Sequence, residues 1–229
     1  MPRATKAAAR SVGRTQLSRE AIVECALEVI QRDGPGTLTL RRLGTELGVD
    51  GTAVYRHFPD KDAIVLAVGD HVLRQTVDRL RESNSPDATW QDRIRALARA
   101  GWDSAEQYPG VISLTFARTT GESAERDIVE LILSVIEPLG LPPEQTVLVY
   151  RMLGDLVLSL TGMNGTSLSM EPAVREKDAT AWSRIYAVQP HQEFPATRRH
   201  MTQLITVTDR EIYDFTIETV IAGIEAMLS

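Results

Sequence analysis

The chain has 229 residues, of which 43% are hydrophobic and 5% aromatic, and it carries a net charge of −6. This length allows one large domain or a small domain joined to a larger one, and the hydrophobic content is ample for a buried core. A single cysteine, Cys25, excludes an intrachain disulfide. We also expect no membrane span and no secretory leader, because we find no apolar run near the required length and no apolar segment at the N-terminus. A cytoplasmic protein without a membrane partner is therefore expected.

The charge is distributed unevenly along the chain. Up to Asp60 there are nine Lys and Arg against seven Asp and Glu, whereas the remainder holds sixteen against twenty-four. The first nineteen residues contain five basic side chains and no acidic one. A basic head on an acidic body suits a protein that binds a polyanion through its head alone.

Residues 1–16 are rich in Ala, Arg and Thr and show no hydrophobic periodicity, so they are predicted to form a disordered basic arm. Arg10 and Arg14 could reach a DNA minor groove or follow phosphates, as arms of helical DNA-binding domains do. A solvated tail without a role is an equally good interpretation.

A first helix is predicted from Ser18, a good N-cap, to about Asp33, where the sequence Gly-Pro-Gly ends it. Four apolar residues at helical spacing mark its core face: Ile22, Ala26, Val29 and Ile30. Cys25 lies within this pattern, and a small core residue is favoured over a redox sensor.

The segment from Thr39 to Lys61 predicts two short helices joined by a tight turn. Thr39 can cap the first helix, and Gly48 ends it where a left-handed residue is needed. Gly44 is small enough for another helix to cross closely. Asp50 can cap the second helix, in which Val54 and Phe58 lie four residues apart and face inward. The pattern is that of a helix-turn-helix.

The outward face of the second helix carries no acidic side chain. It comprises Gly51, Thr52, Ala53, Tyr55, Arg56 and His57. Small residues at its start would let it approach base edges in a major groove, while Tyr55 and Arg56 could donate to phosphates or to a guanine. Lys61, in the first turn of the next helix, opposes the helix dipole unless an anion such as a phosphate lies nearby. Thr39 would also contact phosphates, helped by Arg41 or Arg42.

This region resembles the DNA-binding domain of TetR-family transcriptional regulators. The string LGVDGTAVYRHFPDKDAI is a specific signal, and the matching residues occur in the family's order: Gly34, Thr39, Leu40, Leu43, Gly48, Val49, Tyr55, His57, Phe58, Lys61 and Leu66. A helical hairpin used only for packing is the alternative. Gly44 and Thr45 depart from the alanine-rich sequence common in the family, which bears on base preference and not on the fold.

The resemblance implies an all-α protein with two domains and a homodimeric state. An N-terminal three-helix helix-turn-helix domain would occupy residues 17–65, and a larger helical domain for effector binding and dimerisation would occupy residues 66–229. Such a protein is a transcriptional repressor that binds a palindromic double-stranded DNA operator and leaves it when a small-molecule effector binds.

The remaining elements are predicted from apolar periodicity and breaker residues. Helices are expected at about 60–82, 90–108, 122–139, 144–161, 194–205 and 209–228, with a short segment at 111–118 and a helical turn at 182–187. The stretch SNSPDAT at 83–89 is the clearest break, and 162–180 is expected to be a mobile loop. Asp209 is expected to cap the last helix.

The helices at 144–161 and 209–228 carry apolar surfaces too broad for one neighbour. The resemblance implies that they pair with the same helices of a second chain in a four-helix bundle, with Gly154, Gly162 and Gly223 allowing close approach. Burial within one core is the alternative.

An effector pocket is expected in the second domain. Large or pliable apolar side chains are its candidate lining, and two polar residues on apolar stripes are candidate anchors. These residues are Trp102, Phe116, Met152, Met163, Trp182 and Tyr186, with His71 and Asp155 as the anchors. For each residue alone, ordinary core packing is the more common role, and Asp155 could instead pair with Arg151 or Arg118.

Catalysis is the rival class of function, and the sequence argues against it. The four histidines show no metal-ligand spacing, one cysteine cannot form a thiolate cage, and no nucleophile elbow or nucleotide-binding loop occurs. No enzyme activity, metal or cofactor is therefore expected. A helical protein-interaction module with a non-functional DNA-binding head is the remaining alternative, which steep salt dependence of DNA binding would exclude.

Overall fold

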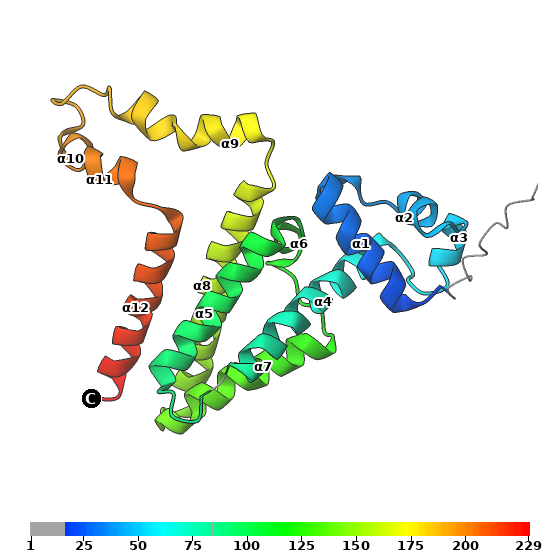
Figure 1. Cartoon of the computed structure of the whole chain (residues 1–229). Coiled ribbons are helices and arrows are strands. Elements are labelled where there is room, and N and C mark those ends of the chain that lie inside the picture. The colour runs from blue at the N-terminus through cyan, green and yellow to red at the C-terminus, as the bar shows by residue number, and fades with distance from the viewer. Residues whose placement is uncertain (1–16, 84) are drawn as a thin grey trace, which may run out of the picture.

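The computed structural model describes residues 17–83 and 85–229, and over these residues it is helical without a strand. Figure 1 shows a small head at one end of a larger helical body. The predicted arm, including Arg10 and Arg14, lies outside the described residues.

The head contains the three predicted helices: α1 (Arg19–Asp33), α2 (Leu40–Leu47) and α3 (Gly51–Val54), with a 3-10 turn η1 (Pro35–Thr37) after α1. Ser18 caps α1 by accepting a hydrogen bond from the Ala21 N–H at 3.1 Å. The apolar stripe predicted for α1 is buried, and Leu43, Val54 and Phe58 are fully buried beneath it. The local signals for caps and apolar faces are therefore confirmed in the head.

The long helix α4 (Lys61–Glu82) belongs to both parts of the molecule. Its first half joins the core of the head through Ile64, Val68 and Val72, and the same core includes Tyr108 and Val111 from the body. A domain boundary at residues 65 and 66 therefore falls inside a continuous helix, and head and body share one apolar core.

The body contains α5 (Trp90–Gln107), α6 (Pro109–Thr115), α7 (Ser123–Ile136), a 3-10 turn η2 (Glu137–Leu139), α8 (Pro143–Leu168) and α12 (Asp209–Met227). Helix α8 crosses α6 at very short range. A Cβ atom placed on Gly162 would lie 2.3 Å from the Phe116 ring, and one on Gly165 would lie 3.1 Å from the Pro109 carbonyl oxygen. These glycines permit the crossing that fixes α6 against α8.

The segment between α8 and α12 holds α9 (Pro172–Ala179), a π-helical turn η3 (Trp182–Tyr186), α10 (Pro195–Arg199) and α11 (Met201–Thr206). Figure 1 shows that it starts at the C-terminal end of α8, runs away from the head, and returns to the N-terminal end of α12. Most of its residues are exposed.

Two predictions in this part of the chain are wrong. The expected loop at 162–180 is largely helical, because its first glycines serve helix packing and do not end α8. The last helix is capped by Thr208 and not by Asp209, since the Thr208 hydroxyl accepts from the Glu211 N–H at 3.2 Å and the Glu211 carboxylate accepts from the Thr208 N–H at 2.8 Å.

Helix α8 also departs from the expectation that no segment approaches a membrane span. An 18-residue window in it has a mean hydropathy of 1.3, and only 22% of that window is buried within the chain. The helix nevertheless packs against α5, α6 and α7 and carries the charged pair Arg151 and Asp155. Most of its apolar window is therefore left uncovered within one chain.

Candidate DNA-binding surface and effector cavity

Helix α3 is a single capped turn whose chain continues in helical turns to Phe58. The Asp50 carboxylate accepts from the Thr52 N–H at 2.8 Å, and bonds from the Thr52 hydroxyl and backbone hold the pKa of Asp50 below its usual range. Tyr55 is 54% exposed although the neighbouring Val54 is fully buried. The buried residue anchors the turn, so the phenol is presented to solvent on a rigid support.

The angle between α2 and α3 depends on two glycines. A Cβ atom on Gly44 would lie 2.9 Å from both the N and the Cα atoms of Gly51, closer than real Cβ atoms approach backbone. Gly48 ends α2 with φ of 66°, in the left-handed region. The backbone of the helix-turn-helix is therefore packed directly against itself.

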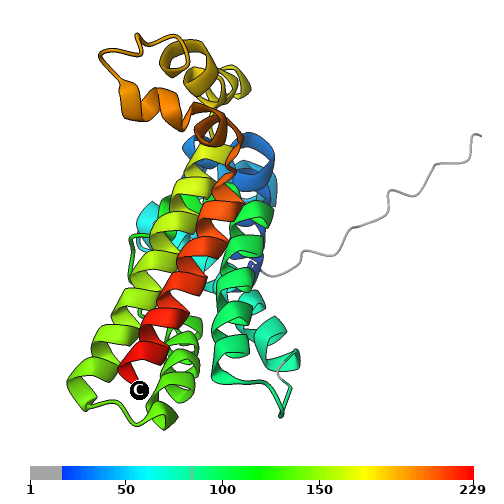
Figure 2. The same cartoon turned by 90° about the vertical axis from the view of Figure 1, so that its left-hand side faces the viewer.

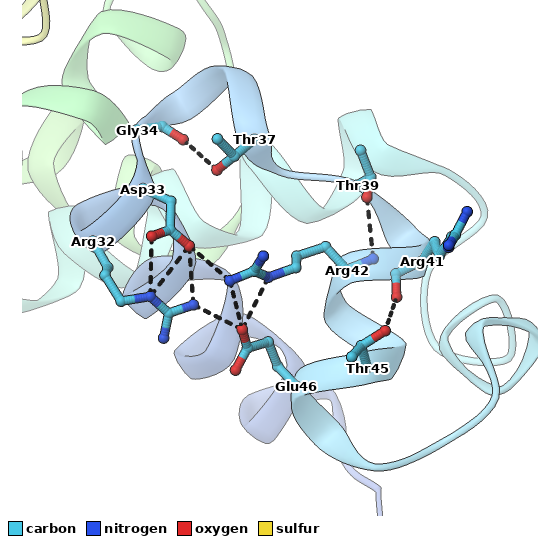
Figure 3. A network of polar contacts seen from close by, with 9 residues as sticks. All are labelled: Arg32, Asp33, Gly34, Thr37, Thr39, Arg41, Arg42, Thr45 and Glu46. Atoms are coloured by element: carbon cyan, nitrogen blue, oxygen red, sulfur yellow. Dashed lines mark hydrogen bonds and ion pairs between the residues drawn. The ribbon is translucent and has the colours of Figure 1, made fainter.

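An ionic network joins the end of α1 to α2 (Figure 3). Arg42 donates to Asp33 and to Glu46, both at 2.9 Å, and Arg32 bonds the same two carboxylates. The guanidinium of Arg32 lowers the pKa of Asp33. Figure 3 shows the Arg41 side chain pointing away from this network. Of the two arginines predicted to help at phosphates, Arg41 is thus the one left available.

The other predicted phosphate contacts lie at helix starts. The Thr39 hydroxyl caps α2 by accepting from the Arg42 N–H at 3.1 Å. Lys61 is the first residue of α4, which Asp60 caps by accepting from the Ala63 N–H at 2.8 Å. Within the described part of the chain, Lys61 and Arg56 are exposed and make no ion pair.

The structure therefore places the described members of the predicted DNA-binding set on α2, α3 and the start of α4. Thr39, Arg41, Thr52, Tyr55, Arg56 and Lys61 are exposed, and Gly51, Ala53 and His57 are partly exposed. Arg19 on α1 contacts the residues after α3. Its guanidinium lies 4.3 Å from the centroid of the Phe58 ring and donates to the His57 carbonyl. Arg19 was missed because nothing in its own helix pattern marks it.

A cavity of about 240 Å³ lies in the body between α4, α5, α6, α7, α8 and α12. Its lining is mainly aliphatic, with Val72, Ile94, Ile132, Leu153 and Val157 among its residues. Of the eight residues predicted to bind a ligand, Phe116 lines this cavity.

The other seven predicted ligand residues do not line it. Trp102 packs on Tyr213 with ring centroids 4.9 Å apart and donates to Glu106, while His71 bonds to Gln75. Asp155 is exposed and paired with Arg151 at 3.2 Å. Three others are exposed on α8 or beyond it: Met152, Met163 and Trp182. Tyr186 stacks on Trp182 at 4.5 Å, far along the projecting segment. The expected convergence of these side chains does not occur, since α8 turns Met152 and Met163 outward.

Sequence reasoning missed the charged residues of the cavity, Arg118 and Glu125. Arg118 also donates to both carboxylate oxygens of Asp62 on α4, at 2.9 and 2.8 Å, and its guanidinium lowers the pKa of Asp62. Arg118 lies in a short connection and Glu125 in the first turn of α7, so neither gives a periodic signal, and only the packing of α6 and α7 shows that they meet the cavity.

Comparison with known proteins matches both parts of the chain. The model for bacterial regulatory proteins of the tetR family matches residues 22–68, and the model for the tetracyclin repressor-like C-terminal domain matches residues 83–228. The chain belongs to the TetR family. The resemblance seen in the sequence is thereby confirmed, as is the all-α fold with an N-terminal helix-turn-helix and a larger helical domain.

Relatives and solved structures agree with this assignment. An uncharacterized HTH-type transcriptional regulator of Mycobacterium tuberculosis is 31% identical over 176 residues, which cover 71% of this chain and 79% of the relative. The HTH-type transcriptional repressor DrrR1 of Streptomyces coeruleorubidus is 25% identical, and the match covers 72% of this chain but only 60% of DrrR1. The TetR regulator SCO7222 of Streptomyces coelicolor has 26% identity and a TM-score of 0.74, covering 93% of this chain and 100% of its own. Membership of a family of transcriptional regulators gives no reason to regard the apolar helix α8 as membrane-spanning.

Proposed function

We propose that this TetR-family protein is a cytoplasmic repressor that binds a palindromic operator as a homodimer and is released by a small-molecule effector. The observation that carries the proposal is the outward face of α3 and the turn after it, which presents Thr52, Tyr55 and Arg56 without an acidic side chain. That face lies near the cations Arg41 and Lys61, and neither of them makes an ion pair within the described part of the chain.

The proposed contacts divide by type. Thr39, Arg41 and Lys61 bind phosphates and set the position of the head, whereas residues 51–57 meet the base edges of a major groove. Phosphate contacts confer salt dependence, and contacts to bases confer sequence preference.

The exposed apolar residues of α8 and α12 support the homodimer. Figure 2 shows these two helices side by side on one face of the body. Leu148 and Met163 on α8 are each 67% exposed, and Phe215 on α12 is 74% exposed. An apolar face of this extent in a soluble protein marks an interface. A second copy related by a two-fold axis would cover it with the same two helices and would place two heads on two half-sites.

The cavity in the body supports the proposal that a small-molecule effector releases the protein from DNA. It is enclosed by α4 on one side, and α4 carries Lys61 at its other end. A ligand that favours one placement of α4 would thus change the spacing of the two heads. A hundredfold loss of operator affinity requires that the ligand favour the released state by about 2.7 kcal/mol.

The proposal is tested by selecting bound sequences from random double-stranded DNA, followed by measurement of affinity with variants. Tyr55→Ala and Lys61→Ala should each weaken binding to the selected site by about tenfold or more. Arg175→Ala, an exposed arginine on α9, serves as the control and should leave affinity unchanged. Retention of full affinity by both head variants would contradict the proposal and would favour a protein-interaction module with an inactive head.

A further inference from the structure

The cavity of the body has a mainly aliphatic lining with a few hydroxyl groups and one pair of ionic side chains. Two of the hydroxyl groups in its wall are already satisfied, since Thr76 donates to the Val72 carbonyl at 3.2 Å and Thr161 donates to the Val157 carbonyl at 2.7 Å. The ionic groups of the lining are Arg118 and Glu125, which follow α6 and begin α7. Among the described residues, a ligand in this cavity therefore meets charged side chains only at Arg118 and Glu125.

These two charges are not equally available. Both terminal nitrogens of Arg118 bond the carboxylate of Asp62, so an opposite charge already balances the guanidinium. The carboxylate of Glu125 has neutral partners only, the Thr120 hydroxyl at 3.0 Å and the Gly121 N–H, and both bond the same oxygen, Oε2. Within the described residues no Lys, Arg or His nitrogen lies within 4.0 Å of Glu125. Among the described residues, Glu125 is thus the carboxylate of the cavity lining that has no cationic partner.

The surroundings of Glu125 strengthen this negative potential. Asp70 lies beside it and accepts from the N–H groups of Ala124 and Glu125 at 3.0 and 3.3 Å. The guanidinium of Arg74 is held by Asp127, and that of Arg126 donates to the Gly121 carbonyl. A ligand that brings a cation to this carboxylate would gain a charge-assisted hydrogen bond that no described side chain supplies.

We propose that the effector is an apolar amine whose ammonium group binds Glu125 while its hydrocarbon part fills the cavity. This inference rests on the proposed role of the cavity as the effector site. The volume limits the size of the ligand. A cavity of about 150 Å³ holds benzene, so 240 Å³ suits a molecule of about ten non-hydrogen atoms.

The position of Glu125 also connects such a ligand to the head. The Glu125 carboxylate accepts hydrogen bonds from Thr120 and Gly121. Two residues of the same connection form ion pairs with the head. Arg118 bonds Asp62 on α4, and Glu122 pairs with Arg19 on α1 at 3.1 Å. An ammonium group that takes a share of the Glu125 carboxylate weakens its hold on this connection, and with it the position of the head.

The first test uses the wild-type protein and three probes of equal chain length: octylamine, octanol and octanoate. Calorimetric titration of the full-length protein without DNA gives the dissociation constants. Octylamine should bind at least about tenfold more tightly than octanol, because a charge-assisted hydrogen bond is lost in the alcohol. Octanoate should bind most weakly. Equal binding of the three probes, tightest binding of octanoate or no binding of octylamine would overturn the proposal.

The second test uses Glu125→Gln, with Glu130→Gln as the matched control on an exposed position of the same helix. The Glu125 variant should bind octylamine at least about tenfold more weakly than wild type and bind octanol unchanged, whereas the control should match wild type for both probes. An octylamine affinity that is equal in the two variants would overturn the proposal. The three-probe comparison on wild type decides the question if the Glu125 variant does not fold.

A failure of the amine proposal can be distinguished from a failure of the proposed repressor function. Operator affinity is measured separately on ligand-free protein. If octylamine fails to bind but the operator is bound, the ligand assignment alone is wrong. If octylamine binds through Glu125 but no DNA sequence is selected, the cavity is an amine site in a protein that is not a repressor.

Discussion

The head and the α8–α12 face differ in how completely the contacts within one chain bury their apolar side chains. In the head, Leu43, Val54 and Phe58 have no exposed surface, and the described helices are closed by their own caps. On α8 and α12, Leu148 and Phe215 remain largely exposed. The head core is therefore completed by contacts within one chain, including those to Tyr108 and Val111 of the body, whereas the α8–α12 surface leaves apolar side chains exposed that the proposed dimer would cover.

Replacement of Phe58 tests the claim that the head is complete. The ring is fully buried between α1 and the rest of the head, and the Arg19 guanidinium lies over it. Phe58→Ala should lower the free energy of unfolding by about 3–5 kcal/mol, through lost burial and the cavity left behind. Urea unfolding followed by circular dichroism measures this. A loss below about 1 kcal/mol would mean that the head is loosely packed.

Replacement of Phe215 tests the opposite claim for α12. The ring is 74% exposed in one chain, so Phe215→Ala should leave the helix content unchanged. If a second copy covers the ring, the dimer dissociation constant should rise by roughly tenfold or more. Sedimentation equilibrium measures it. An unchanged constant would place the dimer contact elsewhere.

Gly44→Ala tests whether the close packing of α2 on α3 stabilises the head. Its Cβ would press on the backbone of Gly51, so the variant should lose about 1–3 kcal/mol of stability and bind DNA less well, because α3 is displaced. Gly36→Ala is the control, since a Cβ at that glycine meets nothing within 4 Å. Equal stability of the two variants would show that α2 and α3 can move apart freely.

The smallest expected effect concerns the ion pair between Asp62 and Arg118, which links the head to the body. The guanidinium lowers the folded-state pKa of Asp62. The pair therefore adds stability above the ordinary pKa of Asp, near pH 4, and the contribution is lost as the pH falls through the folded-state pKa. Asp62→Asn should be slightly less stable than wild type at pH 7 and equal to it near pH 2. A difference that persists in acid would assign the effect to packing.

The same contrast explains what the sequence could predict. Caps such as Thr39 and Asp50, the break at Gly48 and the inward residues of α3 act over a few positions, so local patterns were enough to place them. The cavity depends on how five helices meet around α4, and a side chain such as Met152 is turned outward by that packing and not by its own neighbours in sequence.

Particular residues show where local reasoning ends. Gly162 was predicted to allow close approach of a second chain, and Gly165 fell in the predicted loop, but both serve a close crossing of α8 and α6 within one chain. Arg42 looked like a phosphate contact but is held by Asp33 and Glu46, because the end of α1 lies beside α2. Glu125 carried no pattern at all, since only the packing of the helices brings it into the cavity lining.

The central claim is that two heads, paired through α8 and α12, read one symmetric site. Analytical ultracentrifugation of the protein with a selected palindrome, and with the same DNA after one half-site is scrambled, tests it most directly. We predict two chains on the intact site, and loss of stable binding when one half-site is scrambled or when Phe215→Ala removes the dimer contact. A single chain bound to either DNA with equal affinity would contradict the account.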